Sequence, residues 1–117
     1  MTQNDVQGPP HIAVWTDTSG CIREASSAAA QLLGVSQRGL VHRLMHLYVR
    51  ADRAQVLRAL ERVGLGHEET LELHLQPKER RRVAVRIHLR VDSQAFWGPV
   101  IRWVIHLTPS ASGLRAD

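Results

Sequence analysis

The chain has 117 residues, a mass of 13.1 kDa and a formal net charge of +4, which leaves room for one domain. Apolar residues make up 44% and charged residues 22% of the sequence, and these values exclude an intrinsically disordered chain. The apolar stretches are too short for a transmembrane helix, and the first residues lack the features of a secretory signal. A lone cysteine, Cys21, excludes an internal disulfide, so we expect a cytoplasmic protein.

Turn-forming residues mark both ends of the chain. Residues 1–10 end in Gly-Pro-Pro, and residues 109–117 are rich in small residues. Because neither stretch has an apolar period, we expect a flexible lead-in and a flexible tail or linker. The predicted domain therefore spans residues 11–108.

The predicted domain begins with a β-hairpin. Residues 12–16 have the composition of a strand, and residues 21–24 resume an extended pattern. Between them, residues 17–20 predict a turn, because Asp17 is suited to open it and Gly20 to close it.

Helices are predicted to follow this hairpin. Ser26 is the expected N-cap of the first helix, and Gly34 stands where a left-handed C-terminal residue belongs. A shorter helical turn is predicted over residues 36–46. Asp52 is the expected N-cap of a longer helix over residues 53–63. That helix has an apolar stripe at helical spacing, formed by Val56, Leu57, Leu60 and Val63.

The last third of the chain predicts three strands. Apolar and polar residues alternate over residues 71–76, 83–91 and 101–107, which is typical of a sheet with one buried face. A turn over residues 77–81 aligns the first two strands so that their apolar residues share a face. The pairs expected to lie opposite each other are Leu75 with Val83, Leu73 with Val85, and Glu72 with Arg86. We therefore expect an α+β fold, with one antiparallel sheet of about five strands and helices on one face.

Four motifs in this order resemble those of PAS domains. Residues 12–22 are similar to the strand–Asp–x–x–Gly–x–Ile opening of that family, and residues 28–34 to its small-residue helix ending Leu-Leu-Gly. Residues 49–53 resemble the segment before its long helix, and residues 104–108 its closing strand. The resemblance implies a sensory or regulatory module of a signal-transduction or transcription-control protein. Such modules hold a small ligand, dimerise, or do both, and pass a change to an effector.

A ligand pocket in this fold would lie between the sheet and the helices. Its candidate lining residues are Leu33, Val56, Leu60, Leu73, Val85, Ile87, Trp103 and Ile105. Trp103 is the largest of them, and it either forms a wall of a cavity or fills it. If it fills the space, the chain is a ligand-free module for homodimerisation or protein interaction. The sequence leaves both alternatives open and names no ligand or effector.

The outward positions of the same strands form a candidate face for a homodimer or a partner protein. Its members are Ala84, Arg86, His88, Arg102, Val104 and His106. His74, His88 and His106 share this face with arginines, which would disfavour protonation of the imidazoles and could make the surface respond to pH. The simpler interpretation is a solvated or dimer-facing side of the sheet.

Evidence for a metal or a cofactor is weak. His42 and His46 have the i, i+4 spacing of two ligands on one helical face, but no Cys, Asp or Glu lies close in sequence. Haem-binding PAS domains use a histidine of the long helix, and residues 53–63 contain none. Cys21 lies in a predicted strand and not in the helical motif of flavin-binding photosensors of the LOV type. We therefore expect neither haem nor a flavin adduct.

Catalysis and nucleic-acid binding are not favoured. No spacing specifies a nucleophile–base pair, and the sequence contains no Gly-rich phosphate loop, so we do not expect an enzyme. Five basic residues form a cluster within a stretch of nine, and all but the last of them lie at the predicted hairpin tip: Lys78, Arg80, Arg81, Arg82 and Arg86. Contact with nucleic acid is the less favoured interpretation, because aromatic residues for base stacking are few. A polar turn that discourages edge aggregation is the favoured one.

Overall fold

Five strands form one antiparallel sheet in the computed structural model, which describes residues 11–78 and 80–108. The strands are β1 (Ala13–Thr16), β2 (Ile22–Ala25), β3 (Glu69–Leu75), β4 (Val83–Ala95) and β5 (Gly98–Leu107). Their order across the sheet is β2-β1-β5-β4-β3, which places the first hairpin beside the last strand. The predicted lead-in (1–10) and tail (109–117) lie outside the described residues.

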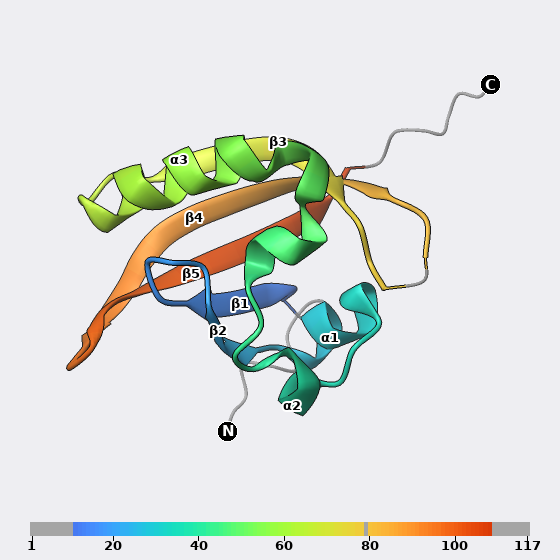
Figure 1. The fold of residues 1–117 in the computed structure, drawn as a ribbon, viewed down its shortest axis with the longest axis horizontal. Coiled ribbons are helices and arrows are strands. Elements are labelled where there is room, and N and C mark those ends of the chain that lie inside the picture. Colours follow the sequence, from blue (N-terminus) through green and yellow to red (C-terminus); the bar gives the residue numbers. More distant parts are fainter. Residues whose placement is uncertain (1–10, 79, 109–117) are drawn as a thin grey trace.

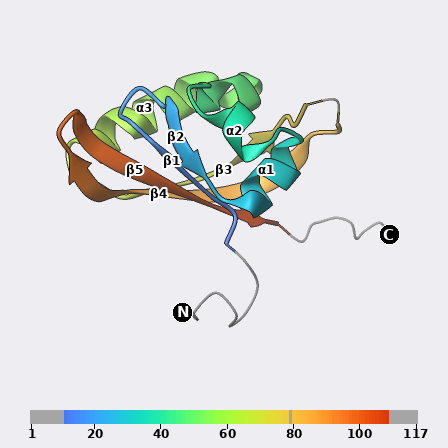
Figure 2. The same cartoon turned by 90° about the horizontal axis from the view of Figure 1, so that it is seen from below.

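The helices connect β2 to β3 and lie along one face of the sheet (Figures 1 and 2). They are α1 (Ser27–Leu33), α2 (Gln37–Leu40) and α3 (Arg53–Gly64), with 3₁₀ turns η2 (Met45–Tyr48) and η3 (Arg50–Asp52) between α2 and α3. This arrangement confirms the predicted α+β architecture. No helix in the described part of the chain has the length and apolar character needed to span a membrane.

The predicted register of β3 and β4 is confirmed at each of its three pairs. Leu75 lies opposite Val83, Leu73 opposite Val85, and Glu72 opposite Arg86. The apolar pairs face the helices, while the Glu72 carboxylate accepts from Arg86 Nη2 at 2.9 Å on the other face. A shift by one residue would exchange the two faces, so burial of the leucines and valines fixes the register.

The predicted turn between β1 and β2 is confirmed and is organised by the Asp17 carboxylate. Its Oδ1 accepts from the backbone N–H groups of Ser19 at 2.9 Å and Cys21 at 3.0 Å, and its Oδ2 accepts from Arg23 at 3.3 Å. Gly20 has a φ of +89°, a conformation that residues with a Cβ rarely adopt. Partial burial opposes ionisation of Asp17, but the hydrogen bonds from Ser19, Cys21 and Arg23 outweigh it and lower the pKa of the carboxyl.

The first helix has the predicted caps. Ser26 Oγ accepts from the backbone N–H of Ala29 at 3.1 Å, and Gly34 takes the left-handed conformation with a φ of +75°. The hydroxyl satisfies one free amide of the first turn, and the glycine permits the N–H groups of the C-terminal turn to bend back to the helix carbonyls.

Predictions for the second helical region are confirmed only in part. Asp52 occupies the N-cap position of α3, as predicted, but its side chain makes no capping hydrogen bond; its Oδ2 accepts from the backbone N–H of His74 at 3.2 Å, because η3 lies along the free edge of β3. The helical turn over residues 36–46 is broken, since α2 ends at Leu40 and His42 has a φ of +77°. Leu57 is 40% exposed, so it lies beside the buried stripe of α3 and not within it.

The core between the sheet and the helices has Trp103 at its centre on β5. Its side chain is completely buried, and its indole N–H donates to Thr16 Oγ1 on β1 at 2.8 Å. The Thr16 hydroxyl in turn donates to the carbonyl of Asp17 at 2.8 Å. Both buried polar groups are therefore satisfied, which removes the penalty of burying them.

We predict that Trp103→Ala lowers the free energy of unfolding by about 3–5 kcal/mol, because it removes a completely buried indole and leaves a cavity. The matched control is Trp97→Ala at the β4–β5 turn, where the indole is 37% exposed and the expected loss is below about 1 kcal/mol. Denaturant unfolding of both variants measures the difference. Equal losses would contradict the central place of Trp103 in the core.

We predict a pH-dependent effect for Asp17→Asn. The carboxyl pKa is lowered in the folded state, so the stabilisation it supplies is present above its unfolded pKa of about 3.9 and is lost as the pH falls through the folded pKa. Near pH 7 the variant should lose about 1 kcal/mol. The difference from wild type should shrink as the pH falls below 4 in chemical unfolding experiments. A difference that is constant from pH 7 down to pH 2 would overturn this account.

Candidate functional site

The eight residues predicted to line a pocket come together in the core. They are Leu33, Val56, Leu60, Leu73, Val85, Ile87, Trp103 and Ile105, and each is at most 4% exposed. All eight belong to one continuous cluster of buried side chains. Neither of the two concavities described below has any of them in its lining. In the structure these residues are buried core side chains that pack in the same cluster as Trp103.

The predicted partner face is the side of the sheet opposite the helices. Here called the outer face, it includes the six candidates Ala84, Arg86, His88, Arg102, Val104 and His106. Cross-strand pairing sets His88 of β4 beside Val104 of β5, and Arg86 beside His106. Arg86 and His106 are exposed, whereas the other four are half-buried. The alternation of residues along β4 and β5 brings these side chains to one surface.

Carboxylates on the outer face meet some of its basic groups. His88 Nε2 lies 3.0 Å from Glu68 Oε1, and His88 Nδ1 lies 3.0 Å from Thr70 Oγ1. The sequence placed these histidines among arginines, and Arg86 and Arg90 do stand at the neighbouring outward positions of β4; His88 has the Glu68 carboxylate beside it in addition. Glu68 directly precedes β3, and pairing of β3 with β4 brings its side chain to the imidazole.

Asp92 and Trp15, which the sequence pattern did not single out as site residues, also organise the outer face. Asp92 Oδ2 accepts from the indole Nε1 of Trp15 at 3.2 Å, and Asp92 Oδ1 lies 3.7 Å from Arg102 Nη1. The carboxylate therefore connects β1, β4 and β5. The register of β4 and β5 shifts between Val91 and Ser93, so Asp92 lies at a β-bulge that strict alternation does not predict.

The weak metal candidates do not lie in one helix. His42 is exposed in a left-handed bend between α2 and η2, whereas His46 belongs to η2. Among the side chains that the structure describes, which do not include that of His46, no group of three or more His, Cys, Asp or Glu is placed to hold a metal ion. Cys21 is half-buried, and its backbone forms an isolated antiparallel β-bridge with Leu44. This position agrees with its predicted place beside the first hairpin.

One concavity is a groove beside the helices α1 and α2. Its lining residues are Ser27, Ala30, Gln31, Gly34, Val35, Ser36, Gln37 and Arg80. Arg80 reaches it from the β3–β4 connection, where its Nη1 donates to the carbonyl of Gln31 at 3.1 Å. This contact fastens the connection to the C-terminal end of α1.

A second, smaller concavity lies at the free edge of β3. It has a volume of about 440 Å³ and is lined by Arg50, Ala51, His74, Gln76 and Arg82. Two members of the predicted basic cluster thus have separate contacts: Arg82 lines this concavity and Arg86 pairs with Glu72. The strand pattern did not reveal the convergence of Arg50 and Arg82, because these residues lie far apart in the sequence.

No protein-family model matches the sequence, and no curated protein matches it. Solved structures do match. The PAS domain of an HTR-like protein from Haloarcula marismortui has a TM-score of 0.74 at 14% identity, covering 89% of this chain and 91% of that chain. The Cycle PAS-B domain of Drosophila melanogaster, with bound ethylene glycol, has a TM-score of 0.72 at 11% identity, covering 83% and 99%. The PAS domain of nitrogen regulation protein NR(II) from Vibrio parahaemolyticus has a TM-score of 0.66 at 15% identity, covering 84% and 89%. The strand order, the helices on one face and these likenesses together show that the chain has a PAS-like fold.

Proposed function

We propose that the chain is a sensory or regulatory module of a signalling protein, and that it acts by pairing with a second copy through its outer face. The likeness to a PAS domain of a nitrogen regulation protein supports the regulatory role. In this proposal the module binds other protein surfaces and carries no catalytic group. An effector domain or partner protein receives the change that the pairing produces.

The outer face is the observation that carries this proposal. The three α-helices of the described residues lie on the other side of the sheet and leave this face uncovered by them (Figure 2). Apolar side chains there are only half-buried, namely Trp15, Ala84, Val100 and Val104. Half-buried apolar groups among charged ones are typical of a protein interface, where the centre is apolar and the rim is polar.

Charges on the outer face are arranged so that two copies could complement each other. Glu68 and Glu72 lie along the β3 side of the face, while Arg90 and Arg102 lie on β4 and β5. A two-fold axis brings the same patch of both copies together, so a patch must contain its own complement. Rotation about such an axis can set the acidic edge of one copy against the arginines of the other.

A small ligand between the sheet and the helices is the second candidate. The likeness to a Cycle PAS-B domain with bound ethylene glycol favours it. The filled space around Trp103 disfavours it, because the residues that would line such a pocket belong to one buried cluster. We therefore place regulation at the surface of the domain.

We predict that Val104→Glu separates the two copies. Val104 lies between His88 of β4 and Ala13 of β1, at the middle of the outer face. A glutamate at this position of each copy would be buried without a partner, and the dissociation constant of the dimer should rise at least about 100-fold. Sedimentation velocity over a concentration series measures the change, with circular dichroism to verify the fold.

The matched control is Leu57→Glu, which adds the same charge to α3 on the helical side, at a residue that is 40% exposed. This variant should remain a dimer like the wild-type chain. A wild-type chain that stays monomeric throughout the series would refute the pairing. Normal dimerisation of the Val104→Glu variant would show that the interface lies on another surface and would contradict the proposed outer-face pairing.

A further inference from the structure

The concavity at the β3 edge is built from three separate parts of the chain. Arg50 and Ala51 come from η3, His74 and Gln76 from the end of β3 and the residue after it, and Arg82 from the residue before β4. Its volume of about 440 Å³ lies in the range of pockets that hold small molecules. We refer to it as the edge pocket.

Hydrogen bonds fix the walls of the edge pocket relative to one another. The backbone N–H of His74 donates to Asp52 Oδ2 at 3.2 Å, and that of Gln76 donates to the carbonyl of Tyr48 at 2.7 Å. These bonds hold the segment that contains η3 against the free edge of β3. Gln76 Nε2 also donates to the carbonyl of Arg80 at 2.8 Å. This bond holds the part of the β3–β4 connection that leads to Arg82. The two arginines are therefore presented from walls that are held in place.

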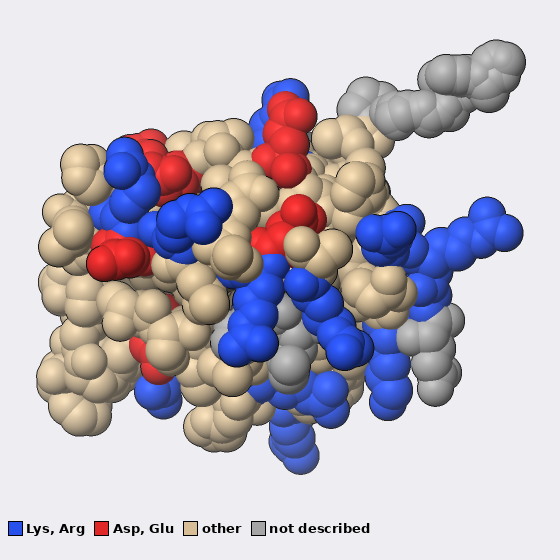
Figure 3. Space-filling model, turned by 45° about the horizontal axis from the view of Figure 1, so that its top comes forward, with Lys and Arg blue, Asp and Glu red and all other residues tan. Residues whose placement is uncertain are grey.

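The charge of the edge pocket is positive. Within residues 11–78 and 80–108, neither Arg50 nor Arg82 has a carboxylate within ion-pair distance. The nearby acidic residue Asp52 directs one carboxylate oxygen to the β3 backbone. Lys and Arg predominate over the right half of the view in Figure 3, on the side of the β3–β4 connection. This excess of positive charge attracts anions to the concave surface.

The side chains at the edge pocket are hydrogen-bond donors suited to an oxyanion. Each guanidinium offers a planar fork of N–H groups that matches the oxygens of phosphate or carboxylate. The two forks come from different segments of the chain, η3 and the residue before β4, and an imidazole lies beside them. A carboxylate carries a single negative charge and two coplanar oxygens, which match one fork best. A tetrahedral phosphate group has enough oxygens and charge to accept from both forks.

From this arrangement we propose that the edge pocket binds the phosphate group of a small soluble phosphate monoester, with Arg50 and Arg82 as its principal ligands and His74 beside them. The remaining volume accommodates the organic part of the ester. This site goes beyond the proposed pairing of two copies and does not depend on it, because Val104 at the middle of the outer face is not among its lining residues.

The test is a titration of the full chain with phenyl phosphate at constant ionic strength, followed by ¹H–¹⁵N NMR. We expect saturable shifts at the backbone amides of Arg50, His74, Gln76 and Arg82. Arg50→Gln and Arg82→Gln should each weaken binding at least about tenfold, because each removes a charge-assisted contact. Spectra of the free variants show whether each remains folded.

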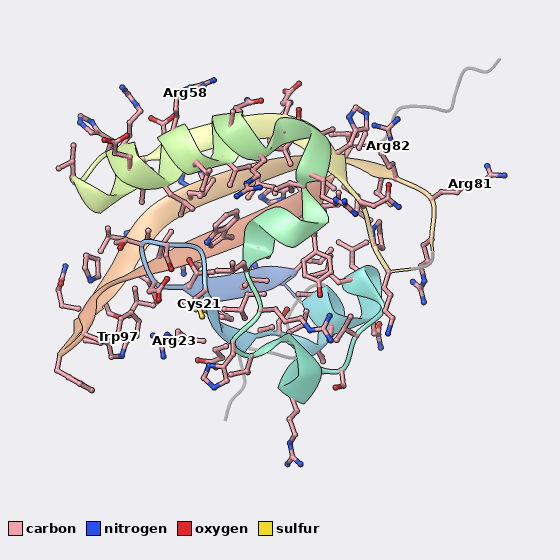
Figure 4. The ribbon with its side chains drawn as sticks, viewed as in Figure 1. Cys21, Arg23, Arg58, Arg81, Arg82 and Trp97 are labelled. Carbon is pink, nitrogen blue, oxygen red and sulfur yellow. The ribbon has the colours of Figure 1, made fainter. Side chains whose placement is uncertain are left out.

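The matched control is Arg81→Gln, which removes the same charge from the neighbouring residue. Arg81 projects away from the domain, while Arg82 lies closer to the sheet (Figure 4). Because Arg81 is not part of the pocket lining, this variant should keep the affinity within about twofold. Equal weakening by Arg81→Gln and Arg82→Gln would overturn the proposal in favour of diffuse attraction by the basic hairpin.

Benzoate provides the control for the chemical class of the ligand. It has the same ring but a carboxylate in place of the phosphate, and we expect it to bind at least about tenfold more weakly. Equal binding of benzoate and phenyl phosphate would overturn the assignment to phosphate. A lack of saturable shifts at the pocket with phenyl phosphate would overturn the site itself.

Discussion

The hydrogen bond between Trp103 and Thr16 is the interaction on which the rest of the structure depends. Trp103 lies opposite Val14 across the β1–β5 pair, and Thr16 lies two residues further along β1 on the same buried face. An indole in an apolar core needs an acceptor for its N–H group, and the Thr16 hydroxyl supplies it at 2.8 Å. The bond therefore fixes the first hairpin against the last strand, although the two are far apart in the sequence.

The indole that fills the core bears directly on the proposed function. The space between sheet and helices is where a ligand would lie in a sensing domain, and here it contains the side chains of one buried cluster. Our two proposals therefore put binding at the surface of the domain. The outer face is partly apolar with charges of both signs, and the edge pocket is cationic and concave.

Much of the fold follows from local patterns in the sequence. Strict alternation along β3 and β4 predicted both the buried face and the pairing of Leu75 with Val83, because side chains of a strand alternate with a period of two. Asp17, Ser26 and Gly34 predicted a turn and two helix caps, because each of those structures needs a particular side chain or backbone conformation.

Contacts between distant segments could not be predicted in this way. The Asp52 side chain has the chemistry of a helix cap, but its position beside the β3 edge gives it another donor, the His74 amide. The spacing of His42 and His46 indicated one helical face, yet the chain turns at His42. Asp92 lies at a bulge that interrupts the alternation of β4. The convergence of Arg50 and Arg82 depends on how η3 packs against the sheet, and no local pattern records that packing.

The filled core is the central claim, and native mass spectrometry of the purified full chain tests it most directly. Apart from any phosphate ester held in the edge pocket, the account predicts that every species has a mass that is a multiple of that of the 13.1 kDa chain. The Arg50→Gln, Arg82→Gln double variant should be measured as well, because any phosphate ester retained in the edge pocket would be lost from it. A small molecule that stays bound to this double variant under native conditions and is released on denaturation would contradict the claim.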